Sequence, residues 1–143
     1  MIDLQKYKEY FNKNDMFSLS CGMKLMEVRE GYSKVELTIS ENSMNYMGSM
    51  HGGLLYTMAD VAAGTAVVYC GKQGVTLNGH TEYIKPALSG KVIAEGKVIS
   101  SGRIIKRCEV EIHSDNGTVY AKSYITMFIT NRDVTFQEGK VPL

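Results

Sequence analysis

Residues 54–70 read LLYTMADVAAGTAVVYC, the longest apolar run in the chain, and they hold a single acid, Asp60. A glycine-rich turn, NYMGSMHGG at residues 45–53, comes directly before this run. A membrane-spanning helix needs about 20 apolar residues and tolerates an acid poorly. The run is shorter than that and rich in small side chains. It therefore predicts the core helix of a globular protein, from about residue 53 to residue 70.

Length and charge restrict the class of protein. The chain has 143 residues, the size of one domain, and we expect a single domain over residues 1–143. Its formal net charge of +1 implies no general attraction to nucleic acid or to an anionic membrane, so neither is expected as a partner. The N-terminus is charged and has no apolar signal-peptide core, which indicates a cytoplasmic protein. Three widely spaced cysteines without a CxxC pair indicate no zinc site, and no bound metal is expected.

Hydrophobic periodicity and turn dipeptides predict the other elements. Leu4, Tyr7, Tyr10 and Phe11 recur near one helical face, which predicts a short helix over about residues 3–13. Six β-rich segments, separated at most joints by turn signals such as Gly31 and Asn116-Gly117, predict strands at residues 22–30, 32–40, 75–85, 91–101, 103–113 and 118–130. This order predicts an α+β fold, in which an antiparallel sheet of about six strands wraps around one long central helix.

The sequence also predicts the bounds of the folded core and the roles of three glycines. The core is expected over about residues 20–130, and QEGKVPL at residues 137–143 is expected to be a loose tail. Gly71 and Gly74 are expected to mark the end of the long helix. Gly64 lies inside that helix, where glycine costs about 1 kcal/mol relative to alanine. We therefore expect Gly64 to permit close packing against the backbone of the sheet.

A spaced set of residues joins the turn to the helix: Asn45, Gly48, His51-Gly52-Gly53, and then Asp60. Two later segments accompany it, GVTLNGHTEYIKPALSGKV at residues 74–92 and SSGRIIKRCEVEIHSDNGTVYAKSYITMFI at residues 100–129. This pattern resembles the hotdog-fold acyl-CoA thioesterases, specifically the phenylacetate-pathway (PaaI-type) group, over about residues 20–130. The resemblance implies thioester hydrolysis without a metal or bound cofactor, coenzyme A being part of the substrate.

The chemistry of the residues agrees with what the resemblance implies. The backbone N–H of Gly52, at a helix N-terminus, can stabilise the oxyanion that develops on a thioester carbonyl, and Asn45 can donate a second hydrogen bond or hold a water. Asp60 can serve as the nucleophile or as the general base that activates water, and both roles stay open. Thr76 matches the family position where a hydroxyl orients the attacking water. The family pattern implies that His51 mainly orients the loop.

Helix geometry adds a constraint on assembly. Gly52 and Asp60 are eight residues apart, which is about 12 Å along a helix axis. One helix can hardly bring both groups to the same carbonyl, whereas a site shared by two chains can. The resemblance implies the same arrangement, a homodimer whose sheets join edge to edge with composite active sites. A dimer of dimers is also expected.

Several residues are candidates for substrate binding, each with a structural alternative. Arg103 is the first candidate for the coenzyme A phosphates and Lys85, Lys106 and Arg107 the others, and solvated strand charges are the alternative. Gly53 is expected to let the substrate approach the backbone. Met47 lies in the loop before the helix with Met44 and Met50, where it can line the acyl channel or only pack the loop. Asn45 and Gly48 can alternatively serve the turn alone.

Other interpretations remain open. His80 shares one strand face with Asn78 and Glu82, and this face lines either a polar part of the acyl pocket or a polar dimer seam. A hydratase or dehydratase on the same fold is one alternative function, although the HFPG and DxNxxH strings typical of those enzymes do not occur. A non-catalytic acyl-CoA-binding protein is the other. Only about 20 residues precede the predicted fold, too few for the DNA-binding helices that such sensors carry.

Overall fold

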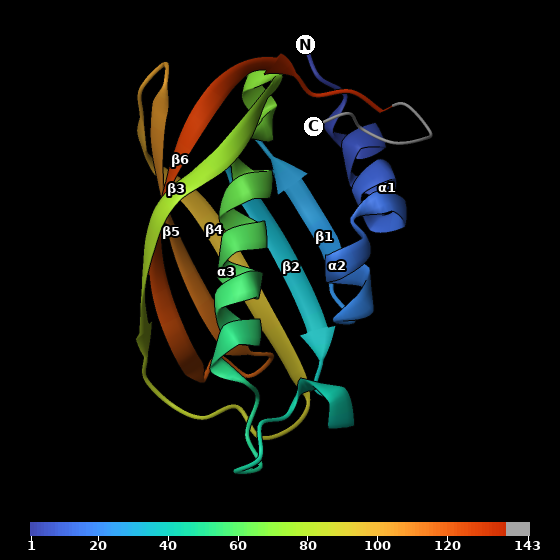
Figure 1. Cartoon of the computed structure of the whole chain (residues 1–143), viewed down its shortest axis with the longest axis vertical. Helices are drawn as coiled ribbons and strands as arrows, with labels where there is room; N and C mark the ends of the chain where they lie inside the picture. The colour runs from blue at the N-terminus through green and yellow to red at the C-terminus, as the bar shows by residue number, and fades with distance from the viewer. Residues whose placement is uncertain (137–143) are drawn as a thin grey trace.

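The computed structural model describes residues 1–136, and the predicted tail at residues 137–143 lies outside them. Its element order confirms the predicted one, with a second short helix and two 3₁₀ turns added (Figure 1). The elements are α1 (Leu4–Asn14), α2 (Met16–Ser20), β1 (Lys24–Arg29), β2 (Tyr32–Thr38), η1 (Glu41–Ser43), α3 (Gly52–Ala66), η2 (Val68–Cys70), β3 (Lys72–Tyr83), β4 (Lys91–Ser101), β5 (Ile105–Ser114) and β6 (Val119–Asp133).

Six strands form one sheet in the order β1-β2-β4-β5-β6-β3, and every neighbouring pair is antiparallel. The sheet curves around α3, as Figure 1 shows. This confirms the predicted α+β architecture. β1 and β3 are the two edges, so the outer edge of β3 has no neighbouring strand within residues 1–136.

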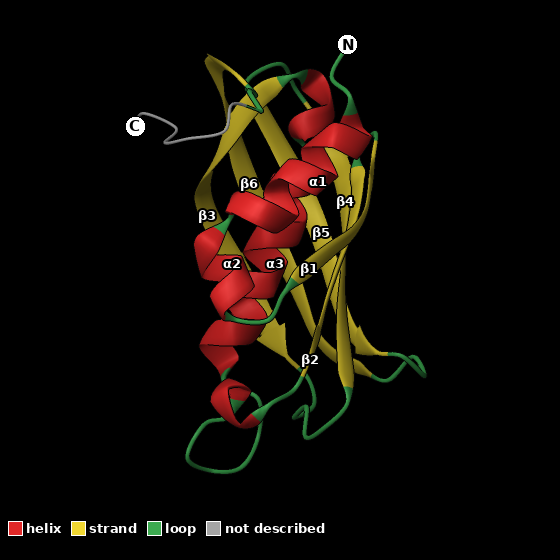
Figure 2. Ribbon diagram, turned by 90° about the vertical axis from the view of Figure 1, so that its right-hand side faces the viewer, coloured by secondary structure: helices red, strands yellow, loops and turns green. Residues whose placement is uncertain are grey.

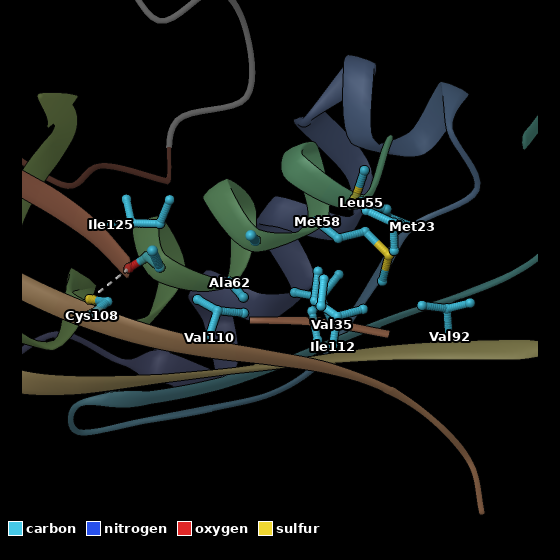
Figure 3. Packing of buried hydrophobic residues seen from close by; sticks show 14 of the residues in the cluster. Met23, Val35, Leu55, Met58, Ala62, Val92, Cys108, Val110, Ile112 and Ile125 are labelled. Atoms are coloured by element: carbon cyan, nitrogen blue, oxygen red, sulfur yellow. Dashed lines mark hydrogen bonds between the residues drawn. The ribbon is translucent and has the colours of Figure 1, made fainter. Parts of the chain in front are cut away.

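Buried apolar side chains, most of them alanines, let α3 lie close to the sheet. Met58, Ala59, Ala62 and Ala63 are fully buried against apolar residues from five strands, and Figure 3 shows this packing around Val35, Val110, Ile112 and Ile125. Among the described residues, one helical segment, Gly52–Cys70, has the length and composition to cross a membrane, with a mean hydropathy of 1.3. Half of that window is buried inside the protein, as expected of a core helix.

The backbones of helix and sheet approach closely at Gly96 of β4. A Cβ atom added there would lie 2.6 Å from the carbonyl oxygen of Ala62, so only glycine fits. The prediction that Gly64 serves this purpose was wrong, because Gly64 faces a cavity rather than sheet backbone. Gly71 ends the helical segment with a φ of 77°, as expected, whereas Gly74 lies inside β3.

The N-terminal helices lie beside α3 on the side away from most of the sheet (Figure 2). Asn12 fixes α1 to strand β1 through a pair of hydrogen bonds to the backbone of Leu25, each 2.8 Å long. Because Leu25 is fully buried, this pair anchors α1 to the core. The space between α1, α2 and α3 is therefore a defined part of the structure.

Candidate active site

The Asp60 carboxylate lies against edge strand β3. It is half-buried on α3, and its Oδ1 accepts a hydrogen bond of 2.5 Å from Thr76 Oγ1. The bond spans sixteen residues and joins the middle of the helix to the strand. Within residues 1–136 the other oxygen, Oδ2, accepts no hydrogen bond. The carboxylate is thus oriented by one partner and has one oxygen available for chemistry.

A cavity of about 670 Å³ opens beside this pair. Its walls come from α1, α2, α3, η2, β3, β6 and the segment that follows β6. The lining residues are Tyr7, Tyr10, Phe11, Asn14, Asp15, Phe17, Ser18, Tyr56, Thr57, Asp60, Val61, Gly64, Thr65, Val68, Gln73, Gly74, Thr76, Met127, Val134 and Thr135. Among the described residues, the acidic side chains on this lining are Asp15 and Asp60, and no lysine, arginine or histidine lines it. Burial and the negative charge of Asp15 both raise the pKa of Tyr7, which keeps its hydroxyl protonated.

Asn45 organises the turn before α3. Its Oδ1 accepts hydrogen bonds from the backbone N–H groups of Met47 and Ser49, at 2.9 and 3.1 Å. Its Nδ2 donates to Ser49 Oγ at 3.1 Å, which leaves one amide N–H for another acceptor. Gly48 has a φ of 88° in the same turn, so its expected turn role is confirmed. The amide of Asn45 therefore supports the turn and retains one free donor.

The first turn of α3 has one unused backbone donor. His51 caps the helix, since its Nδ1 accepts the N–H of Gly53 at 2.9 Å and its carbonyl oxygen accepts from Leu54 and Leu55. Within residues 1–136, nothing accepts a hydrogen bond from the N–H of Gly52. Tyr83 of β3 donates from its hydroxyl to the Gly52 carbonyl oxygen at 2.8 Å. The capping turn thus leaves the Gly52 N–H available at the positive end of the helix dipole.

The two groups of candidate residues lie apart in one chain. Asp60 and Thr76 line the cavity, whereas none of Asn45, His51 and Gly52 does so within residues 1–136. Gly52 and Asp60 both belong to the straight helix α3, which keeps them about 12 Å apart along its axis. One chain therefore carries two separate groups of candidate residues and does not combine them.

Comparisons with known proteins place the chain in a family. Residues 47–121, more than half of the chain, match the family model described as the thioesterase superfamily. The chain belongs to the thioesterase superfamily. A candidate esterase of Archaeoglobus fulgidus is 28% identical over 131 residues, which are 91% of this chain and 85% of that relative.

Solved structures agree with this superfamily. The PaaI protein from the phenylacetic acid degradation operon of Escherichia coli has a TM-score of 0.87 at 21% identity, over 92% of this chain and 96% of that chain. In sequence, the E. coli acyl-coenzyme A thioesterase PaaI is 26% identical over 84 residues, 57% of this chain and 58% of PaaI. A hypothetical thioesterase of Streptococcus pneumoniae, solved with coenzyme A, has a TM-score of 0.74 at 30% identity, over 78% of this chain and 91% of that chain. The predicted hotdog fold, family resemblance and thioester hydrolase class are confirmed.

The lysines and arginines that are candidates for binding the coenzyme A phosphates differ in how exposed they are. Arg103 and Lys85 are exposed, in the turn after β4 and just after β3, so each is accessible to a phosphate. Lys106 is only 6% exposed, and its Nζ donates to Ser101 Oγ at 2.7 Å and to the Gly102 carbonyl at 3.0 Å. These contacts favour the structural alternative for Lys106, because its ammonium group holds the turn that carries Arg103.

The remaining candidates lie away from the cavity. Met47 is exposed in its loop, whereas Met50 is buried, so the loop methionines do not form one surface. His80 and Asn78 lie on the outer face of the sheet, where they line a separate hollow of about 420 Å³ with Arg107 and other residues. Within residues 1–136 that face does not line the cavity of Asp60, which favours the dimer seam of the two alternatives for His80. Within residues 1–136, no group of three or more His, Cys, Asp or Glu residues can hold a metal ion.

Two features of this thioesterase superfamily member were missed from the sequence. The bond from Tyr83 to Gly52 joins residues 31 positions apart, and no local pattern indicates such a contact. Aromatic side chains of α1 line the cavity, whereas their spacing in the sequence was used only to predict a helix. Tyr7 and Phe11 lie one turn apart on the apolar face of that helix, and such a face packs against another part of the protein. This spacing was the signal in the sequence for the aromatic wall.

Proposed function

We propose that this protein hydrolyses the thioester of an acyl-CoA to a free acid and coenzyme A. One observation carries the proposal. The Asp60 carboxylate is held by Thr76 at the wall of a cavity, with its second oxygen free. A half-buried carboxylate in that setting is suited to act as a general base or a nucleophile on a bound thioester.

Both routes lead to the same products. As a base, Asp60 takes a proton from water while the water oxygen attacks the carbonyl carbon, and collapse of the tetrahedral intermediate expels the coenzyme A thiolate. As a nucleophile, Asp60 forms a mixed anhydride with loss of the thiolate, and water then hydrolyses the anhydride. In either route the carbonyl oxygen becomes negative and needs hydrogen-bond donors. The free N–H of Gly52 and the remaining N–H of Asn45 are the donors proposed.

The donors reach Asp60 from a second copy of the chain in this proposal. The separation of the two groups of candidate residues, the half-sites of this proposal, within one chain supports it, and the unpaired edge of β3 is the surface through which two sheets would join. The functional unit is accordingly a homodimer with two composite sites, and a dimer of dimers is proposed as the larger assembly. Arg103, Lys85, Gly53 and Met47 are the proposed contacts to the rest of the substrate.

The S. pneumoniae relative supports the choice of residues. Its solved forms include a variant with an aspartate replaced by alanine and another with a threonine, sixteen residues further on, replaced by alanine. Asp60 and Thr76 have the same separation and are joined by a hydrogen bond. The solved complex of that relative with coenzyme A supports an acyl-CoA as the substrate here.

A thiol-release assay with a panel of acyl-CoAs tests the proposal. We expect turnover by the wild type and a loss of at least about 100-fold in kcat for Asp60→Asn, the usual scale for a general base. Circular dichroism controls for folding, since the amide keeps the shape of the carboxylate. Saturable binding of acyl-CoA without thiol release would instead show a binding protein. Hydration of an enoyl-CoA without thiol release would show a hydratase.

A further inference from the structure

Gly64 lies one helical turn after Asp60 on the same face of α3. Both residues line the cavity, as does Val68 one turn further on. Each turn advances the helix by about 6 Å over four residues. A substrate whose carbonyl carbon is next to Asp60 can therefore extend its acyl chain along this face, first past Gly64 and then toward Val68.

The space at Gly64 is not explained by packing. A Cβ atom added there would meet one atom, Cε of Met127, at the ordinary contact distance of 3.8 Å. The residue lies three positions before the C-cap Val67, and its φ lies outside the left-handed region that favours glycine. Glycine inside a helix is less stable than alanine, so neither local geometry nor stability accounts for it. Because glycine has no side chain, position 64 leaves room inside the cavity.

The cavity wall combines aromatic and aliphatic side chains with uncharged polar ones. Tyr7 and Phe11 of α1 contribute two aromatic rings with centroids 6.1 Å apart, and Val68 and Val134 contribute aliphatic surface. Within residues 1–136, the charged groups on the lining are the carboxylates Asp15 and Asp60. This surface stabilises an uncharged chain, and it repels an acyl group that ends in a second carboxylate.

We propose that Gly64 is a specificity-determining residue, which lets uncharged acyl chains longer than acetyl lie along α3 beneath α1. This inference rests on the proposed acyl-CoA hydrolysis. An acetyl group ends near Asp60 and does not reach Gly64. A longer chain must pass it, and any side chain at this position projects into its path.

Two variants test the proposal, with acetyl-CoA as the internal control substrate. Gly64→Ala and Gly64→Leu should keep kcat/KM for acetyl-CoA close to the wild-type value. For octanoyl-CoA we expect a graded loss that reaches about tenfold or more in Gly64→Leu, the scale of one misfitted group in an apolar pocket. Gly64→Ala should also melt at a higher temperature than the wild type, because alanine favours the helix. A general loss of structure would lower turnover of both substrates together.

The outcomes separate this proposal from the proposed function. If the wild type releases no thiol from any acyl-CoA, the proposed function fails. If it hydrolyses octanoyl-CoA but the ratio of octanoyl-CoA to acetyl-CoA turnover is unchanged across the folded variants, the role of Gly64 alone is refuted. A wild type that hydrolyses acetyl-CoA but not octanoyl-CoA, or prefers glutaryl-CoA to pentanoyl-CoA, would also overturn it.

Discussion

The hydroxyl of Tyr83 donates a 2.8 Å hydrogen bond to the carbonyl oxygen of Gly52, joining edge strand β3 to the first turn of α3. The ring of Tyr83 also packs on Gly52, since a Cβ atom added to this glycine would lie 3.4 Å from Cε1 of the tyrosine. The other end of the Gly52–Gly53 peptide donates to Nδ1 of His51. Two side chains thus fix the Gly52–Gly53 peptide plane. The free Gly52 N–H belongs to the preceding His51–Gly52 peptide, which shares the Cα of Gly52 with the fixed plane and whose carbonyl oxygen accepts from Leu54 and Leu55.

Removal of the Tyr83 hydroxyl should therefore weaken catalysis more than binding. Tyr83→Phe keeps the ring on Gly52 and loses the hydrogen bond. We expect kcat to fall by about 3- to 30-fold with little change in KM, because a less precisely held donor stabilises the transition state less. Steady-state kinetics with one good acyl-CoA measures this. Tyr124→Phe, on the outer face of the sheet, is the matched control, and an equal fall in both variants would assign the effect to general stability.

Two inactive variants should rescue each other if the sites are composite. Asn45→Ala damages the turn half-site and Asp60→Ala the carboxylate half-site. A mixed dimer of the two holds one site with both lesions and one with neither. Subunits refolded together in equal amounts should recover about a quarter of wild-type activity, since half the dimers are mixed and half their sites are intact.

Each variant refolded alone is the control for that experiment. Differential tags establish that mixed dimers are present. If tagged mixed dimers form and the mixture is no more active than its parents, the whole site lies within one chain.

Arg103 should contribute to KM rather than to kcat. A phosphate contact far from the thioester binds substrate and transition state alike, so Arg103→Ala should raise KM for acyl-CoA and leave kcat nearly unchanged. Raised salt should reduce the difference between the variant and the wild type. Lys24→Ala, at an exposed position of β1, is the control for loss of one positive charge. The assignment is wrong if KM stays at the wild-type value, or if Lys24→Ala raises KM equally.

A hydrogen-bonded cluster on the outer face of the sheet should affect stability in acid. The hydroxyl of Tyr32 donates to Glu95 at 2.5 Å, and His113 lies 2.7 Å from the other carboxylate oxygen. The bond from Tyr32, together with His113, holds the pKa of Glu95 below its ordinary value of 4.5, against the opposing effect of burial. A lowered pKa in the folded state stabilises the protein above the unfolded pKa. That stability is lost as the pH falls through the folded value.

Glu95→Gln should accordingly destabilise the protein at neutral pH and make unfolding less pH-dependent below about pH 4.5. The side chain of Glu95 is 34% exposed, so we expect a loss below about 2 kcal/mol after solvent screening. Urea unfolding between pH 3 and pH 7 measures it. Glu111→Gln, which removes an exposed ion pair with Lys122, is the control and should change stability little. Equal acid sensitivity of the wild type and Glu95→Gln would contradict the prediction.

Local patterns were sufficient for most of the fold. Val35 and Leu37 alternate with polar residues in β2, and both are buried as that alternation requires. Turn dipeptides such as Asn116-Gly117 fall between strands, because a left-handed glycine is a local requirement. Asp60 and Thr76 were chosen through their place in a family pattern, and the structure joins them by a hydrogen bond.

What could not be predicted depends on distant contacts. Glycine at position 64 and glycine at position 96 look alike in sequence, yet one faces a cavity and the other a helix carbonyl. Lys106 occupies an inward position of β5 and satisfies its ammonium group with a turn, which no strand pattern indicates. Such roles are set by the neighbour across the fold, and the sequence identifies that neighbour only after the fold is known.

The unpaired edge of β3 has a consequence for solubility. An uncovered edge strand offers its N–H and C=O groups to any other extended chain, and apolar side chains beside it favour aggregation. Val75 and Leu77 of β3 are 50% and 54% exposed. In the proposed dimer, dilution that separates the two copies would therefore uncover an edge that can pair with other extended chains. The edge proposed to complete the catalytic site is thus also the edge that the proposed dimer would protect from aggregation.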